Sequence, residues 1–184
     1  GKNIFEGNEG QKEFIGFLPE NNPLYENLTV QENLNFWLDI KKVLPSLKAP
    51  ALGKLVKELG LADVFFRPIS ELSKGYRQRV GLCQALIGDP KILLLDEPTE
   101  GLDPNQRREI HNLIAGLGKE RTVVVCSHVL SEITKMCSRA IIINKGKIVA
   151  DDSVEKLTSN AHGKQVLTLV ASGNNIKLVL LGLP

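Results

Sequence analysis

The fold is decided by residues 72–104, in which the stretches LSKGYRQRV (72–80) and KILLLDEPTEGLDP (91–104) are joined by a helical pattern. Residues 92–95 form a continuous apolar run, which is typical of a strand that is buried on both faces in a parallel sheet. Helical patterns precede and follow this run. The sequence therefore predicts an α/β fold in which a mainly parallel sheet is flanked by helices.

Two adjacent carboxylates, Asp96 and Glu97, follow the predicted strand at its carboxyl end. Ligands bind at this edge in open α/β sheets. Neighbouring side chains on an extended chain point to opposite sides, so the two carboxylates can have different roles. We expect Asp96 to hold Mg²⁺ through water, and Glu97 to orient or activate an attacking water. This stretch is interpreted as half of a nucleotide-hydrolysing site.

A helix is predicted to begin at Ser73, Lys74 and Gly75, because Ser73 stands at an N-cap position and apolar residues recur at helical spacing after it. The free N–H groups and the positive dipole end of such a helix can accept a phosphate, with the Ser73 hydroxyl and Lys74 as further donors. The alternative is a plain helix cap, because most Ser-capped helices bind only their own backbone.

Further along the chain, Asp103 caps another predicted helix, with Pro104 at its first position. Residues 123–126 predict a second buried strand, which ends at Ser127 and His128. A single histidine is more often a satisfied polar residue than a ligand. Here the strand-end position places His128 on the same sheet edge as the two carboxylates, so we expect it to reach a shared ligand.

Before the central stretch, residues 14–18 predict a strand that ends at Pro19. Glu20 follows this strand in a polar turn. A carboxylate just past a strand end can serve a ligand site, and a solvated turn residue explains it equally well. Both interpretations of Glu20 stay open on this segment alone.

The pattern of residues from about 24 to 88 predicts a small α-helical lobe that is inserted into the α/β core. A capping box begins a helix that runs to about Val43. A linker bracketed by Pro45 and Pro50 follows, and then a second helix over residues 51–59. Aromatic residues concentrate in or beside this lobe, either as its core or as a groove for a partner, and we favour the core. They are Tyr25, Phe36, Trp37, Phe65 and Phe66.

After the second strand, residues 140–150 predict a hairpin and residues 153–157 a short helix. Two further strands are predicted at residues 165–170 and 176–181. Both ends of the chain look cut, because residue 1 is Gly and the last apolar run has nothing after it to cover it. We therefore treat the sequence as a fragment.

The composition is that of an ordinary globular protein, with 42% hydrophobic and 24% charged residues among 184. The net charge of +2 implies no nucleic-acid partner. Cys83, Cys126 and Cys137 lack metal-ligand spacing, and we expect buried thiols in a reducing compartment. No apolar run approaches the roughly 20 residues that span a bilayer, and no signal pattern begins the chain, so a cytoplasmic protein is expected.

With these residues identified, the chain resembles the ATP-binding cassette (ABC) ATPases, the subunits that drive ABC transporters. Five stretches carry the resemblance, in the order found in that family. They are IGFLPE (15–20) at the Q-loop, LSKGY (72–76) at the signature motif, ILLLDE (92–97) at the Walker B strand, GLD (101–103) at the D-loop and SH (127–128) at the switch histidine. The sequence departs from the pattern at Glu20, where Gln is usual, and at Lys74 and Tyr76, where Gly and Gln are commoner.

The resemblance implies a P-loop NTPase core that binds ATP and Mg²⁺. On this basis Asp96 and Glu20 contact Mg²⁺, Glu97 orients the attacking water, and His128 contacts the γ-phosphate. Residues 1–160 are then a partial ABC ATPase domain, and residues 161–184 begin a truncated C-terminal extension.

The resemblance also implies two kinds of partner. A second ABC ATPase subunit pairs head to tail, so that Ser73, Lys74 and Gly75 close over the nucleotide of the other subunit and Asp103 links the two sites. A membrane permease docks near Tyr25 and the aromatic cluster. The subunit is then peripheral on the inner face of the cell membrane. The signature and Q-loop segments are most similar to those of exporters, including the gliding-motility and multidrug groups.

The phosphate-binding Walker A loop is not found in the sequence. No Gly-x-x-x-x-Gly-Lys-Ser/Thr occurs, and the nearest stretch, GLGK (116–119), follows a predicted helix and lacks the distal Gly. We expect this loop to lie before residue 1, so the chain alone should be inactive. The alternatives are a soluble ABC ATPase that is not coupled to transport, or a non-catalytic interaction module. The intact Asp96, Glu97 and His128 argue against the module.

Overall fold

The computed structural model describes residues 14–161. The chain divides into two compact units, residues 1–137 and residues 138–184, and each is described by itself. The two strands predicted at 165–170 and 176–181 lie outside the described residues. The predicted boundary near residue 160 stays a prediction.

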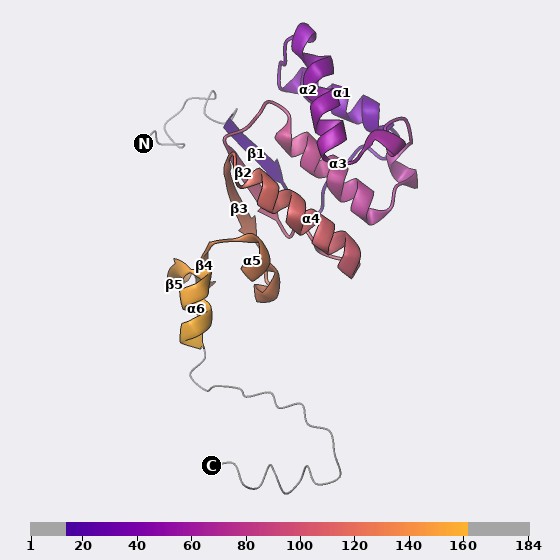
Figure 1. Cartoon of the computed structure of the whole chain (residues 1–184). Coiled ribbons are helices and arrows are strands. Elements are labelled where there is room, and N and C mark those ends of the chain that lie inside the picture. Colours follow the sequence, from indigo (N-terminus) through magenta and orange to yellow (C-terminus); the bar gives the residue numbers. More distant parts are fainter. Residues whose placement is uncertain (1–13, 162–184) are drawn as a thin grey trace, which may run out of the picture. The chain divides into compact units, whose positions relative to one another are not determined.

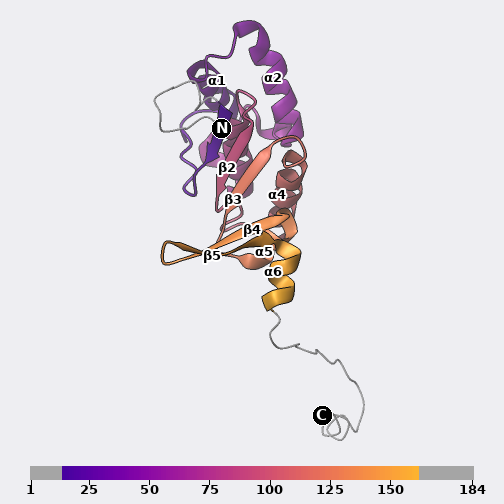
Figure 2. The same ribbon diagram turned by 90° about the vertical axis from the view of Figure 1, so that its left-hand side faces the viewer.

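Three parallel strands form the sheet of the first unit (Figure 2). They are β1 (Ile15–Leu18), β2 (Ile92–Asp96) and β3 (Thr122–Cys126), in the order β1-β2-β3. Leu18 of β1 pairs with Leu95 of β2, which in turn pairs with Val125 of β3. The parallel sheet predicted from the apolar runs is confirmed, and the register brings the carboxyl ends of all three strands to one edge.

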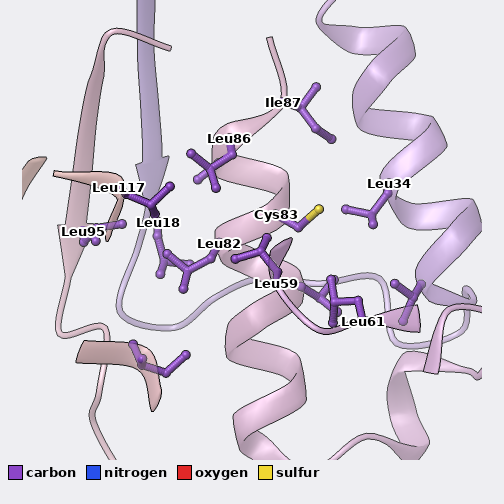
Figure 3. Close-up of a cluster of buried hydrophobic side chains, with 14 of the residues drawn as sticks. Leu18, Leu34, Leu59, Leu61, Leu82, Cys83, Leu86, Ile87, Leu95 and Leu117 are labelled. Carbon is purple, nitrogen blue, oxygen red and sulfur yellow. The ribbon is translucent and has the colours of Figure 1, made fainter. Parts of the chain in front are cut away.

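One face of this sheet is covered by helix α3 (Lys74–Leu86), and helix α4 (Pro104–Leu117) adds Ile110, Ile114 and Leu117 to the same core. In Figure 3, Leu82 and Leu86 of α3 point toward the sheet, and Leu34 approaches the other side of this helix. These side chains are at most 2% exposed. The packing fixes where α3 begins, and therefore where Ser73 and Lys74 lie.

The prediction that the central strands are buried on both faces is wrong for the described residues. On the second face Phe17 is 55% exposed and Val124 is 45% exposed, while Leu94 between them is half-buried. Cys126 lies at the end of β3 and is exposed, whereas Cys83 is buried as expected. Residues 14–161 cover only one face of the sheet, because α3 and α4 supply their apolar side chains to that face.

The helical lobe contains α1 (Val30–Ile40), α2 (Pro45–Glu58) and two short 3₁₀ turns, Ala62–Val64 and Ile69–Glu71 (Figure 1). The predicted capping box is confirmed. The predicted linker is wrong, because residues 45–50 form the first turns of α2. Pro45 takes the first helical position, where its missing N–H costs nothing, and Pro50 is tolerated inside the helix.

Helix α5 (Leu130–Met136) follows β3 and completes the described part of the first unit. In the second unit β4 (Arg139–Asn144) and β5 (Lys147–Ser153) form the predicted hairpin. It turns at Lys145 and Gly146, which both have positive φ. Helix α6 (Val154–Ala161) follows. No helix among the described residues is long and apolar enough to cross a membrane.

Candidate functional site

The candidate residues that follow strands come together at the carboxyl edge of the sheet. Asp96 is the last residue of β2, and Ser127 and His128 directly follow β3. Glu20 lies two residues past the end of β1 and is exposed. Because the three strands are parallel and in register, the edge expected from the sequence exists.

Glu97 and His128 are in direct contact. The Nδ1 atom of His128 lies 2.7 Å from Oε1 of Glu97, and the His128 backbone N–H donates to the same oxygen at 2.8 Å. The Ser127 hydroxyl donates to the other carboxylate oxygen, Oε2, at 3.2 Å. Three donors from one segment therefore hold this carboxylate in a fixed orientation, although Glu97 and His128 are far apart in the sequence.

The backbone of Glu97 has a left-handed conformation, with φ of 44°. Its N–H donates to the Cys126 carbonyl at 3.0 Å, and its own carbonyl accepts from the Glu100 N–H at 3.1 Å. A residue other than glycine in this region costs of the order of 1–3 kcal/mol, and such residues cluster at functional sites. The turn carries the Glu97 side chain toward the end of β3.

The same contacts perturb the pKa values of both partners. Partial burial opposes the charged form of Glu97, but the hydrogen bonds from the His128 ring, the His128 N–H and the Ser127 hydroxyl outweigh it and lower the pKa of the carboxyl. The hydrogen bond to Glu97 and its negative charge raise the pKa of His128. The pair therefore favours a carboxylate beside an imidazolium, and the ionised carboxylate can accept a hydrogen bond from a water and orient it.

Asp96 has a different environment. It is half-buried, and no hydrogen bond or ion pair to another residue of 14–161 engages its carboxylate. No group of three or more possible metal ligands occurs among the described residues. A single available carboxylate fits Mg²⁺, which is usually bound by one or two carboxylates together with water and substrate phosphates. Asp96 would hold the ion, and Glu20 lies at the same sheet edge.

The start of α3 forms a second group of candidate residues. Ser73 is its N-cap, and its hydroxyl accepts from the Tyr76 N–H at 3.4 Å. Ser73 and Lys74 are exposed, while Gly75 is buried against α4, where a Cβ atom would lie 2.8 Å from Gln106. A cavity of about 260 Å³ opens beside Ser73 and Gly75. The helix start is therefore open to solvent, and its binding of a phosphate stays a prediction.

The turn before α4 lies against this helix start. Asp103 caps α4, since its Oδ1 atom accepts from the backbone N–H groups of Asn105 and Gln106 at 2.9 and 3.0 Å. Gly101 has φ of 66°, and a Cβ atom added there would meet the Lys74 ammonium. The structure therefore brings Lys74 and the turn 101–103 together. Among the described residues, no hydrogen bond or ion pair joins this second group to the Glu97–His128 pair.

Sequence reasoning missed several residues that support the site. It treated Ser127 only as a strand end, and it gave no role to Thr99, His111 and Glu132, which are buried together beneath the turn that follows β2. The Ser-His pair after a strand is a local signal that could have indicated Ser127. The other contacts join residues far apart in sequence, and no periodicity reports them.

A family model described as "ABC transporter" matches residues 3–100, which is more than half of the chain. The chain belongs to the ABC transporter family. The match contains Glu20, the start of α3 and the adjacent carboxylates Asp96 and Glu97. The predicted recognition as an ABC transporter ATPase subunit is confirmed.

Three relatives have names that refer to transport. "Probable multidrug ABC transporter ATP-binding protein YbhF" of Escherichia coli is 32% identical over 90% of this chain and 28% of its own length. "Uncharacterized ABC transporter ATP-binding protein YhcH" of Bacillus subtilis is 39% identical over 77% of this chain and 46% of its own. "Lantibiotic transport ATP-binding protein SrtF" of Streptococcus pyogenes is 35% identical over 87% of this chain and 72% of its own length. The chain thus spans less than half of the first two.

Among solved structures, cbiO1 from Clostridium perfringens, part of the ABC transporter complex cbiONQ, resembles the chain with a TM-score of 0.75. The identity is 24%, and the match covers 83% of this chain and 62% of that one. This likeness concerns the fold. The predicted fold class, an α/β P-loop NTPase core with an inserted helical lobe, is confirmed.

Proposed function

We propose that this chain is part of the ATP-hydrolysing subunit of an ABC transporter. The observation that carries the proposal is the Glu97 carboxylate, which three hydrogen bonds from Ser127 and His128 hold directly after Asp96. A fixed carboxylate at the carboxyl edge of a parallel sheet is suited to orient a water for attack on a phosphoryl group.

The residues of the edge divide the work. Mg²⁺, when bound, supplies positive charge that neutralises the charge developing on the transferred phosphoryl group. Asp96 holds the ion, with Glu20 as a second oxygen ligand, and Glu97 orients the attacking water. His128 contacts the γ-phosphate oxygens, and its raised pKa favours the positive charge that this contact needs.

The start of α3 serves a different nucleotide. Within the described residues no direct hydrogen bond or ion pair joins it to the Glu97–His128 pair, while Ser73 and Lys74 are exposed beside a cavity. This arrangement supports a head-to-tail dimer in which Ser73, Lys74 and Gly75 bind the ATP of the partner subunit. Asp103, in the turn against Lys74, links the two sites.

Coupling to transport involves the helical lobe. Tyr25 is 51% exposed and packs edge to face against Phe36, with ring centroids 5.3 Å apart. Phe36 packs in the same way against Trp37. The core role favoured from the sequence is wrong for Tyr25 and Phe36, which are exposed. An exposed aromatic cluster of this kind is suited to anchor a partner, and we assign it to a membrane permease at the inner face of the cell membrane. The multidrug and lantibiotic names of two relatives support export.

The test uses a form of the protein that is extended at its N-terminus to include the phosphate-binding loop. The unchanged extended form should hydrolyse ATP in the presence of Mg²⁺. Glu97→Gln should keep ATP binding and reduce phosphate release by about 100-fold or more, because the amide cannot act as a base. The 184-residue chain, which lacks the loop, is the control and should release no phosphate. Turnover by Glu97→Gln near that of the unchanged protein would remove Glu97 from this role.

A further inference from the structure

A buried carboxylate outside the described site joins three segments of the chain. The side chain of Glu132, on α5, is only 7% exposed. The hydroxyl of Thr99, in the turn after β2, donates to its Oε2 atom. Arg107 of α4 donates to Oε1 at 3.4 Å, and Nε2 of His111 lies 3.7 Å from Oε2. Burying a carboxylate is costly without such partners, so this position commits α5 to one placement.

Arg107 extends the link to the turn that carries Asp103. Its Nε–H donates to the Leu102 carbonyl at 2.8 Å, while its Nη1 atom reaches Glu132. The Arg107 backbone N–H donates to the Asp103 carbonyl at 2.9 Å. One guanidinium therefore bridges the buried carboxylate and the backbone of the D-loop turn.

The backbone of Glu132 leads to the segment that holds Glu97. Its N–H donates to the Val129 carbonyl at 3.0 Å. The Val129 N–H donates in turn to the Ser127 hydroxyl at 3.1 Å, and that hydroxyl donates to Glu97. The first turn of α5 and the Ser127–His128 segment therefore form one hydrogen-bonded unit, and Glu132 is its buried anchor.

We propose that Glu132 is a positioning residue that fixes the Ser127–His128 segment against Glu97. It ties this segment to the turn after β2 through Thr99, and to the D-loop turn through Arg107. The predicted effect on turnover rests on the proposed ATPase function, whereas the predicted effect on the geometry of His128 does not.

The geometry is tested in the 184-residue chain by NMR. The His128 amide proton, which is hydrogen-bonded to Glu97 at 2.8 Å, reports whether the segment is in place. In Thr99→Val, which keeps the size of the side chain and removes the hydroxyl, its signal should move upfield toward that of an amide bonded to water. In Thr99→Ser, which restores the hydroxyl, the signal should return. A His128 signal that is unchanged in Thr99→Val and in Glu132→Gln would overturn the proposal.

The effect on chemistry is tested in the N-terminally extended form. Glu132→Gln and Thr99→Val should each lower kcat by about 10–100-fold with KM for ATP within about twofold, because a misplacement of catalytic groups by about 1 Å has this effect. The double variant should lose little more than either single one. Glu120→Gln, which removes an exposed carboxylate, is the control and should leave kcat unchanged.

The NMR and kinetic experiments distinguish a failure of the proposed ATPase function from a failure of the role proposed for Glu132. If the unchanged extended form shows no turnover, the proposed function fails, and the NMR arm still decides on Glu132. If the variants melt at lower temperature but keep kcat, Glu132 only stabilises the fold and the inference is wrong.

Discussion

The left-handed backbone at Glu97 destabilises the fold, whereas the hydrogen bonds to its side chain stabilise it. A φ of 44° costs free energy, whereas each hydrogen bond to a charged group returns about 1.5–3 kcal/mol. The three donors to this carboxylate come from Ser127 and His128. The conformation persists because β3 ends where these donors are needed.

The charge state of His128 provides a prediction at this scale. The hydrogen bond and the charge of Glu97 raise its pKa above the ordinary value of 6.5, so an NMR titration of the 184-residue chain should find the imidazole protonated to higher pH than a free histidine. Glu97→Gln removes the charge and should return the pKa toward 6.5. Glu120→Gln should not change it. A His128 that titrates at the same pH with and without the Glu97 carboxylate would contradict the assigned contact.

The same shifts define a pH window for stability. The pKa of His128 is higher in the folded state than in the unfolded state. Its contribution to the free energy of unfolding is therefore fully present below pH 6.5 and is lost as the pH rises through the pKa of the folded state. The pKa of Glu97 is lower in the folded state, so its contribution is present above 4.5 and is lost as the pH falls through the folded value. The pair should therefore stabilise the fold most between about pH 4.5 and 6.5.

The sequence predicted where these side chains lie along the chain, but not what they contact. Asp96, Glu97 and His128 were identified because each follows an apolar run that is long enough for a strand. The Ser127 contact depends on the positive φ of Glu97, which is rare outside glycine and has no signal in the residue type. The Thr99–Glu132 hydrogen bond was missed because buried polar pairs follow no periodic pattern.

At the scale of elements, a close approach fixes the packing of α3 against the segment after β1. The Asn22 side chain donates to the Arg77 carbonyl of α3 at 2.8 Å. A Cβ atom on Gly81 would lie 2.2 Å from the Asn22 Oδ1 atom, so only glycine leaves room for this contact. Asn22 lies two residues after Glu20, and this contact connects the turn at the sheet edge to the helix that begins at Ser73.

Gly81→Ala should therefore destabilise the chain, although alanine is the better helix former by about 0.5–1 kcal/mol. The clash with Asn22 should outweigh this gain and give a net loss of about 1 kcal/mol or more. In the Asn22→Ala background the clash is absent, and Gly81→Ala should become stabilising. Urea unfolding of the four chains measures this change of sign.

Gly53 provides the matched control for this cycle. It lies inside α2, and a Cβ atom added there would meet nothing within 4 Å. Gly53→Ala should stabilise the chain in both backgrounds. If Gly81→Ala stabilises the chain as Gly53→Ala does, with Asn22 intact, the close approach does not exist.

Two errors in predicting the elements have physical causes. Pro50 was interpreted as a helix boundary because an interior proline removes the N–H that would donate to the Ser46 carbonyl, yet α2 continues through it and buries Leu52 in the core, and such packing supplies most of a helix's stability. The apolar runs of β2 and β3 were interpreted as buried on both faces. Apolar composition reports what a strand can bury, whereas Phe17 and Val124 stay exposed because the described residues supply helices to one face only.

At the scale of the whole molecule, the candidate site residues fall into two separate groups. Glu97 and His128 lie at the sheet edge, and Ser73 and Lys74 lie at the start of α3. Among residues 14–161 no hydrogen bond or ion pair connects the groups. If both contact ATP, the simplest assembly is a symmetric dimer in which each nucleotide lies between the sheet edge of one subunit and the α3 start of the other.

This assembly predicts complementation between inactive variants of the extended form. Glu97→Gln disables the sheet edge, and Ser73→Arg blocks the α3 start with a bulky side chain. Each variant alone should be inactive, because every site in its homodimer contains the altered group. A mixed dimer combines both alterations in one site and leaves the other intact. Equal mixing should therefore restore about a quarter of the unchanged activity, since half of the dimers are mixed and each has one active site of two. Phosphate release is measured after the subunits are exchanged, and each variant's melting temperature confirms that it is folded. If the two groups act on the same nucleotide within one subunit, no mixture can contain an intact site, and activity after mixing stays at the level of the separate variants.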